Sequence, residues 1–283
     1  NGLVRELIQN SQDAKIDNNE PVKIKIRLLE IDKEQIPCFD EEWLPRYQCI
    51  NNKWKDKYPG FFKKTNDSLT KDKLRVFEFS NFNCEGLKGD DDDDTSSFNA
   101  CVLSEGNSVS ESTSGGSYGI GKNAIFNISN TRTVLYSSKS VNGEVIFMGI
   151  SKLAQYEYQN NRYSSRIILG DENFNSVRDK KKVPEVFKRA KPGLSQYAIC
   201  ADFDENTRTK IVNSVFFNYF KQLKDKKLEV EIIDEIHEDN KQPYSVQYEK
   251  EMKFWIENSD AEGKEKIDLQ LISALEGKRH EKS

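Results

Sequence analysis

The chain has 283 residues, of which 36% are hydrophobic and 32% charged, and its formal net charge is −4. These values suit a globular chain of one large or two modest domains, and they exclude an overall electrostatic attraction to nucleic acid or acidic lipid. Because no apolar run approaches the roughly 20 residues that span a bilayer, we expect no membrane segment.

The number and position of the cysteines and histidines argue against several kinds of catalytic and metal site. The five cysteines are odd in number and no pair has C-x-x-C spacing, so we expect reduced thiols and a cytoplasmic location. The only histidines, His237 and His280, lie late in charged stretches, which disfavours histidine triads and metal clusters. A helical pattern starts almost at Asn1, without a signal peptide, and we expect the natural N-terminus to lie upstream.

The first third of the chain alternates between periodic and irregular segments. Residues 2–14 have helical spacing, and residues 21–29 alternate as a half-buried strand. We interpret residues 32–72 as an insertion with short helices and residues 74–80 as a second strand. Residues 88–118 are rich in Gly, Ser, Thr and Asp, and we expect a long mobile loop whose acidic run, Asp90 to Asp94, is solvated.

The remainder predicts a helix followed by a strand-rich segment. The helix covers residues 118–128. The strands are expected at residues 132–138, 144–150, 163–169, 195–203 and 228–233, with an amphipathic helix over residues 206–223 before the last of them. The tail after His237 is polar, with one apolar patch at residues 269–275.

The first helix carries polar side chains at regular spacing. Glu6, Asn10 and Asp13 are spaced i, i+4, i+7 and so share one helix face. Phosphoryl hydrolysis uses such a set, with a carboxylate to activate water and an oxygen ligand for Mg²⁺. An amphipathic helix with a polar outer face explains the same spacing, so this helix alone leaves both interpretations open.

A second segment, residues 78–87, places Asn81 at the end of a strand and Gly86 five residues later. Taken alone, this pattern is only a strand and a turn. A third segment, residues 115–124, places Gly116, Gly119 and Gly121 before an apolar helix. Glycines there let backbone N–H groups approach phosphate oxygens, and Lys122 adds a positive charge. The spacing matches neither a P-loop nor a Rossmann fingerprint.

In this order, the three segments resemble the N box and the two glycine boxes of GHKL ATPases, the superfamily of gyrase, heat-shock chaperones, histidine kinases and MutL. The form E-L-I-x-N-S-x-D-A at residues 6–14 is similar to the heat-shock chaperone, MutL, Morc and gyrase branch. The resemblance covers about residues 1–235 and implies a Bergerat fold. That fold is an α/β two-layer sandwich of a mixed β-sheet with helices on one face, and residues 88–118 would be its ATP lid. Residues 236–283 would be a polar tail or the start of a transducer-like segment.

The resemblance also implies roles for individual residues. Glu6 matches the general base, Asn10 the Mg²⁺ ligand and Asp13 the acidic residue that closes the N box. Asn81 falls where the family has the aspartate that accepts a hydrogen bond from the adenine amino group, and Gly86 matches the glycine that leaves room for the base. The phosphate-wrapping box corresponds to Gly116, Ser117, Tyr118, Gly119, Ile120, Gly121 and Lys122.

Two positions depart from the family pattern. Asn81 replaces the aspartate, although an amide oxygen can still accept from an amino group and its nitrogen can donate toward the ring. We expect weaker or retuned adenine binding. The family's late Gly-Thr element falls at residues 193–195, where Leu194 has no hydroxyl, and we expect Ser195 to supply it.

The resemblance implies Mg²⁺-dependent ATP hydrolysis that drives lid closure and homodimerisation within a larger protein. Anti-phage defence or DNA transactions are the expected setting by analogy, with a protein partner or DNA bound through parts outside this chain. Two alternatives stay open. One is a histidine-kinase-type catalytic domain, which Glu6 and the missing phosphoacceptor helix disfavour. The other is a nucleotide-sensing module without turnover.

Overall fold

The computed structural model describes residues 2–104 and 120–257, and of residues 120–123 it describes only the helical backbone. Its centre is an eight-stranded sheet in the order β10-β9-β1-β2-β8-β3-β4-β7. Strand β1 runs parallel to β9, and the other neighbouring strands are antiparallel, so the sheet is mixed. The strands are β1 (Val22–Asp32), β2 (Lys73–Phe82), β3 (Ser129–Lys139), β4 (Val145–Lys152), β7 (Arg166–Leu169), β8 (Gly193–Ala201), β9 (Leu228–Asp234) and β10 (Tyr244–Ser245).

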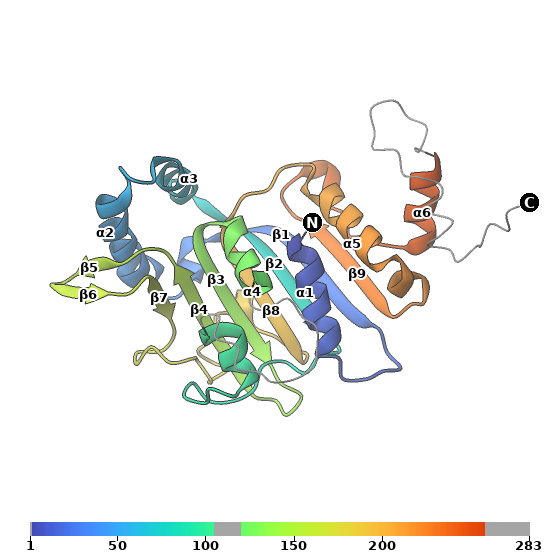
Figure 1. Cartoon of the computed structure of the whole chain (residues 1–283), viewed down its shortest axis with the longest axis horizontal. Helices are drawn as coiled ribbons and strands as arrows, with labels where there is room; N and C mark the ends of the chain where they lie inside the picture. Colours follow the sequence, from blue (N-terminus) through green and yellow to red (C-terminus); the bar gives the residue numbers. More distant parts are fainter. Residues whose placement is uncertain (1, 105–119, 258–283) are drawn as a thin grey trace, which may run out of the picture.

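Within the described residues, three helices cover one face of the sheet: α1 (Gly2–Asp13), α4 (Ile120–Ile128) and α5 (Thr207–Lys224). Figure 1 shows α1 between the other two, with the sheet behind them. Strand residues that alternate toward this face, such as Ile24, Ile26 and Phe79, form one buried core with the helices. The expected α/β two-layer sandwich with a mixed sheet is confirmed.

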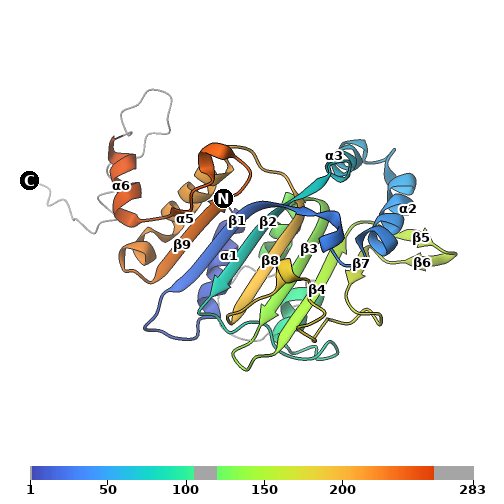
Figure 2. The ribbon, with the colours of Figure 1, turned by 180° about the vertical axis from the view of Figure 1, so that it is seen from behind.

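The expected insertion builds a second, smaller core on the opposite face. It contains α2 (Leu44–Trp54) and α3 (Pro59–Leu69), as well as short turns η1 (Lys33–Gln35) and η2 (Phe39–Trp43). Trp43 is fully buried, stacks between Phe39 and Tyr47, and donates a 2.6 Å hydrogen bond to Ser151. Figure 2 shows that α2 and α3 stay at one end of this face, beside the hairpin of β5 (Tyr156–Tyr158) and β6 (Asn161–Tyr163).

Residues after the expected boundary at 235 still belong to the packed domain. Following turn η5 (Glu238–Asn240), β10 pairs with β9, and α6 (Tyr248–Glu257) packs beside α5. The rings of Phe217 and Trp255 lie 5.1 Å apart, and Met252 joins the main core. The structure therefore places residues 236–257 with the domain. The apolar patch at residues 269–275 lies outside the described residues.

No helix within residues 2–104 and 120–257 combines the length and apolar content that crossing a bilayer requires.

Candidate functional site

A cavity of about 370 Å³ opens where α1 crosses the ends of β2 and β8. Turn η3 (Asn99–Leu103) and the segment after β2 form its remaining walls. The cavity brings together residues that lie up to 190 positions apart in the chain. Its lining residues are Glu6, Leu7, Asn10, Ser11, Ala14, Asn81, Cys84, Glu85, Gly86, Leu87, Ser97, Ala100, Cys101, Leu194 and Gln196.

Helix α1 supplies two of the expected polar side chains. Its apolar face, with Leu7 and Ile8 buried, packs on the sheet and leaves Glu6 and Asn10 along the cavity. Glu6 is half-buried and pairs with Arg5 at 3.1 Å, between Arg5 Nη2 and Glu6 Oε1. Asn10 is exposed, and its side chain has no hydrogen-bond partner among the residues described. A carboxylate and an uncommitted amide thus stand one helical turn apart at the cavity wall.

The third expected residue of the N box does not line this cavity. Asp13 is exposed at the last turn of α1, where its carboxylate accepts a 3.0 Å hydrogen bond from Gln9. It shares the helix face with Glu6, but seven residues of helix separate the two by about 10 Å along the axis. The structure therefore brings Glu6 and Asn10 to the site and leaves Asp13 outside it.

Asn81 is the most constrained side chain of the cavity and is 6% exposed. Its Oδ1 accepts a 2.7 Å hydrogen bond from the backbone N–H of Leu194, and its Nδ2 donates a 3.0 Å hydrogen bond to Ser11. A backbone N–H can only donate, so the atom facing Leu194 must be the amide oxygen. Ser11 in turn donates to the carbonyl of Leu7. The amide orientation is therefore set by its neighbours.

Two glycines permit this close packing. Gly193 has φ +130°, and a Cβ there would lie 2.3 Å from the Asn81 carbonyl oxygen. Gly86 has φ +74°, and a Cβ there would lie 2.3 Å from the Lys139 carbonyl oxygen. Gly86 lines the cavity as expected, and the structural reason for glycine at this position is the approach to Lys139.

Ser195 does not face the cavity, so the expectation that its hydroxyl replaces the family's threonine there is wrong. Neighbouring residues of a strand point to opposite faces, and the cavity takes Leu194 and Gln196 from β8. On the far face, Ser195 shares a 2.6 Å hydrogen bond with Ser80 and accepts another from Arg189. On the cavity side, the backbone N–H of Leu194 donates a hydrogen bond to Asn81 instead.

A buried polar network on the face of the sheet opposite the cavity contacts the backbone of Asn81. Arg189 donates a 2.6 Å hydrogen bond to the Asn81 carbonyl oxygen, and Ser80 donates to Glu78, which pairs with Arg27 at 2.9 Å. Burial lowers the pKa of Arg189 to about 10, against the opposing effect of Tyr197 and Glu78. These contacts join the end of β2 to the start of β8.

The first half of the expected lid is anchored. Phe98 is fully buried and Val102 joins the main core, so residues 88–104 have more apolar anchoring than we expected. Asp91, within the acidic run, accepts hydrogen bonds of 2.6 Å from both the backbone and the hydroxyl of Ser176 and pairs with Arg178 at 2.9 Å. This carboxylate is therefore a structural anchor, although its neighbours in the run are mostly exposed.

The expected phosphate box falls largely beyond the described part of the chain. Gly116, Ser117, Tyr118 and Gly119 lie outside the described residues, as do positions 105–115 of the expected lid. Ile120, Gly121 and Lys122 form the start of α4, as backbone only. Helix α4 packs against α1, so the segment that follows the box lies on the same face of the sheet as Glu6 and Asn10.

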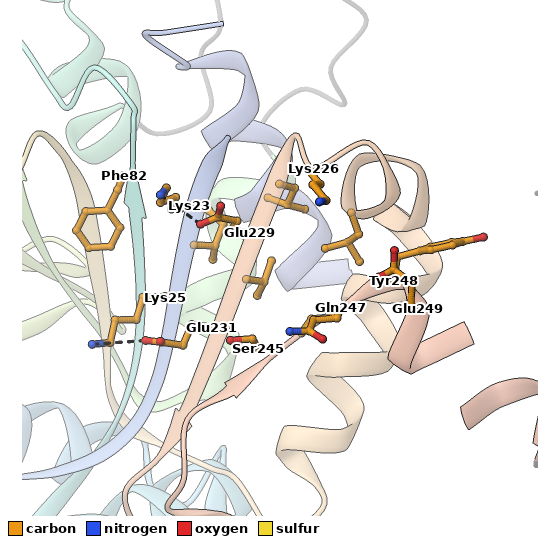
Figure 3. Close-up of a pocket in the computed structure, with 15 residues that line it drawn as sticks. Lys23, Lys25, Phe82, Lys226, Glu229, Glu231, Ser245, Gln247, Tyr248 and Glu249 are labelled. Carbon is orange, nitrogen blue, oxygen red and sulfur yellow. Dashed lines mark ion pairs between the residues drawn. The ribbon is translucent and has the colours of Figure 1, made fainter. Parts of the chain in front are cut away.

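A larger cavity of about 560 Å³ lies at the β9 edge and includes none of the expected residues. Figure 3 shows two ion pairs along it, with Lys23 3.3 Å from Glu229 and Lys25 3.8 Å from Glu231. Both pairs are exposed to solvent, and the other charged residues of this cavity, Lys226 and Glu249, belong to none of the three motifs. The cavity at α1 is therefore the candidate functional site.

Sequence reasoning missed Ser11, the Leu194 backbone and Gln196. Strand alternation groups Leu194, Gln196 and Ala198 on one face and puts Ser195 on the other, but it does not say which face meets the helices. Nothing in the sequence signals the role of Arg189, since its contacts depend on how three distant segments meet.

No protein-family model matches the sequence, and no curated protein matches it. Among solved structures, the fold is similar to the crystal structure of an N-terminal domain of a DNA repair protein. That likeness has a TM-score of 0.32 and 11% sequence identity, and it covers 86% of this chain and 50% of that one. At this level the likeness carries no argument about function. What the structure shows is an α/β two-layer protein with a cavity between its helical layer and the strand ends.

Proposed function

We propose that this chain binds ATP with Mg²⁺ in the α1 cavity and hydrolyses it, in the manner of the GHKL ATPases that its motifs resemble. One observation carries the proposal: Glu6, Asn10, Asn81 and Gly86, which come from two separate motifs, line one cavity of about 370 Å³. That volume lies within the range of small-molecule sites. Chance motif matches would have no reason to converge on one cavity.

The β2 end of the cavity is suited to the adenine base. Asn81 Oδ1 accepts one hydrogen bond from Leu194, and a carbonyl oxygen has a second lone pair to offer an amino group. Leu7, Ala14 and Leu87 provide apolar surface around it. A base bound there would bury its ring against these side chains while its amino group pairs with the amide oxygen.

The α1 end is suited to the phosphates and Mg²⁺. Mg²⁺ prefers oxygen ligands and commonly keeps phosphate oxygens and waters around one or two protein ligands. The Asn10 amide fits that role, because its side chain is exposed and has no partner in the described ranges. When bound, Mg²⁺ would neutralise charge on the phosphates.

Glu6 then acts as the base that orients the attacking water. It lies one helical turn before Asn10 and reaches the same cavity, so its carboxylate would face the terminal phosphate. The 3.1 Å pair with Arg5 holds Glu6 on the helix surface, and Arg5 is largely exposed. The pair can open at little cost, since exposed ion pairs are weak.

At a larger scale, ATP would close residues 88–118 over the cavity and promote a homodimer. The anchored part, residues 88–104, would serve as the hinge side, because Asp91 and Phe98 hold it to the domain. Such a cycle would serve a larger cytoplasmic protein, and bacterial anti-phage defence or DNA transactions remain the setting we propose by analogy.

Two observations favour a second function, nucleotide sensing without turnover. The Arg5 pair competes for the Glu6 carboxylate, and Asn81 departs from the family's aspartate. Under this alternative, ATP binds and changes the lid, but no phosphate is released. Release of inorganic phosphate by the complete protein separates the two.

The first test is calorimetric titration of the whole chain with ATP in the presence and absence of Mg²⁺. We expect saturable binding that weakens when Mg²⁺ is chelated. The matched control is Glu231→Gln, which changes a charged residue of the β9 cavity and should leave the binding curve unchanged. Absence of ATP binding at millimolar nucleotide, with a folded protein, would overturn the proposal.

A further inference from the structure

We propose that Gln196 is a second side chain that recognises the base. Asn81 accepts a hydrogen bond from the adenine amino group, and Gln196 donates a hydrogen bond to the ring nitrogen next to that amino group. The two amides together would make the cavity selective for adenine over guanine. This inference rests on the proposed function, because it concerns the base of the same nucleotide. Glu6 and Asn10 play no part in it.

Gln196 lies on the cavity side of β8. In the sheet it pairs with Phe79 of β2, while the next pair is Ser80 with Ser195 on the far face. Phe79 and Ala198, which share its face, belong to the helix-side core. The side chain of Gln196 is half-buried and lines the cavity together with Asn81.

No hydrogen bond or ion pair occupies the Gln196 amide within residues 2–104 and 120–257. The contrast with its neighbours is clear: Asn81 uses both ends of its amide, and Ser195 and Ser80 are bonded to each other. Gln196 is not among the fully buried side chains that lack a partner, so its amide is open to the cavity. A ligand in the cavity can therefore accept a hydrogen bond from it.

The register places Gln196 and Asn81 two residue pairs apart along neighbouring strands. Asn81 follows Phe79 by two residues, which is about 7 Å along the strand and on the same face. Gln196 stands opposite Phe79, so its side chain starts two residue pairs deeper in the sheet than Asn81. Both residues nevertheless line the same cavity, so a bound base lies between them.

The fixed orientation of Asn81 decides which base fits. The Leu194 N–H holds the amide oxygen in place as an acceptor, and its second lone pair would accept from the base. Adenine offers an amino group there and a ring nitrogen acceptor next to it, to which the Gln196 Nε2 can donate. Guanine offers a carbonyl oxygen in place of the amino group. The Asn81 oxygen and the guanine carbonyl oxygen would then face each other without a hydrogen between them. Neither would have a hydrogen-bond donor, which selects against guanine.

The inference is tested with analogues as well as variants. We expect the parent chain to bind ATP about ten times more tightly than 1-deaza-ATP, in which a carbon replaces that ring nitrogen, since one hydrogen bond is lost. GTP should bind more weakly still. In Gln196→Leu, ATP should weaken about tenfold and should no longer be preferred over 1-deaza-ATP.

Gln196→Glu separates hydrogen bonding from packing. It keeps the shape but an ionised carboxylate cannot donate, so it should behave like Gln196→Leu. Equal affinity of the parent for ATP and 1-deaza-ATP, or ATP affinity unchanged in Gln196→Leu, would overturn the role of Gln196 while leaving ATP binding in place. Absence of binding by any of the three nucleotides would overturn the proposed function and this inference together.

Discussion

The side-chain oxygen of Asn81 lies 2.7 Å from the backbone nitrogen of Leu194, 113 residues later in the chain. This hydrogen bond joins β2 to β8 at the cavity and fixes the amide of the residue expected to contact the base. The role of Asn81 thus depends on its partners as much as on its own chemistry.

Replacement of Asn81 tests the base contact. Asn81→Ala removes the amide and leaves the Leu194 N–H without its acceptor, so we expect ATP binding to weaken by about 1–3 kcal/mol. Asn81→Asp keeps the acceptor, and Ser11 can turn its hydroxyl toward the new carboxylate, so binding should be preserved or tighter. Calorimetric titration with ATP and Mg²⁺ measures both. Weaker binding by Asn81→Asp than by Asn81→Ala would contradict the assignment.

Glu6→Ala tests the catalytic base. Loss of a positioned base costs about 10²–10⁴-fold in rate, whereas binding relies on other residues and should remain. Phosphate release by the complete protein measures the rate, and Glu34→Gln, an exposed carboxylate in η1, is the matched control. Hydrolysis at the parental rate in Glu6→Ala would show that Glu6 is not the catalytic base and only forms an ion pair with Arg5.

Asn10 tests the Mg²⁺ site. In Asn10→Ala the oxygen ligand is lost, and ATP affinity should no longer respond to Mg²⁺, while the fold is kept because the side chain is exposed. Asn10→Asp retains an oxygen and should keep the response. The measurement is the ratio of ATP affinities with Mg²⁺ and with chelator. The same ratio in the parent and Asn10→Ala would exclude Asn10 as a ligand.

Because the pKa of Asp91 is lowered in the folded protein, we expect the stability of the fold to depend on pH. Burial opposes its ionisation, but hydrogen bonds from Ser176 and the Arg178 guanidinium outweigh burial and lower the pKa. A lowered folded-state pKa stabilises the fold above the unfolded value of about 3.9, and the contribution is lost as pH falls through the lower folded value. The difference in unfolding free energy between the parent and Asp91→Asn should therefore be constant near neutral pH and shrink below about pH 4. Denaturant titrations across that range measure it, and a difference that grows on acidification would contradict the anchor.

Gly193 and Gly143 both have positive φ, so alanine substitutions at these positions form a matched pair. Gly193→Ala would press its Cβ against the Asn81 carbonyl, whereas a Cβ at Gly143 meets nothing within 4 Å. Gly143→Ala should cost about 1 kcal/mol of stability from its φ alone. Gly193→Ala should cost more and should also weaken ATP binding, because Asn81 must move. Thermal unfolding and calorimetry compare them, and equal effects would show that the contact with Asn81 is unimportant.

Most of the elements could be predicted from the sequence because their patterns are local. Strand β1 alternates, and Ile24, Ile26 and Leu28 are buried as that alternation requires. The end of the domain was not predicted, although Tyr248, Met252 and Trp255 have helical spacing, because α6 is held by contacts with α5 such as the one between Phe217 and Trp255.

Local patterns are sufficient to predict the α/β class and the shared helix face of Glu6 and Asn10, because helix and strand periods depend only on neighbouring residues. They do not predict that Ser195 faces away from the cavity and that Gln196 faces into it. Those positions depend on the register of β8 against β2, and a shift of one residue would exchange the two faces. Register is set by packing between segments far apart in the chain, and no local pattern contains it.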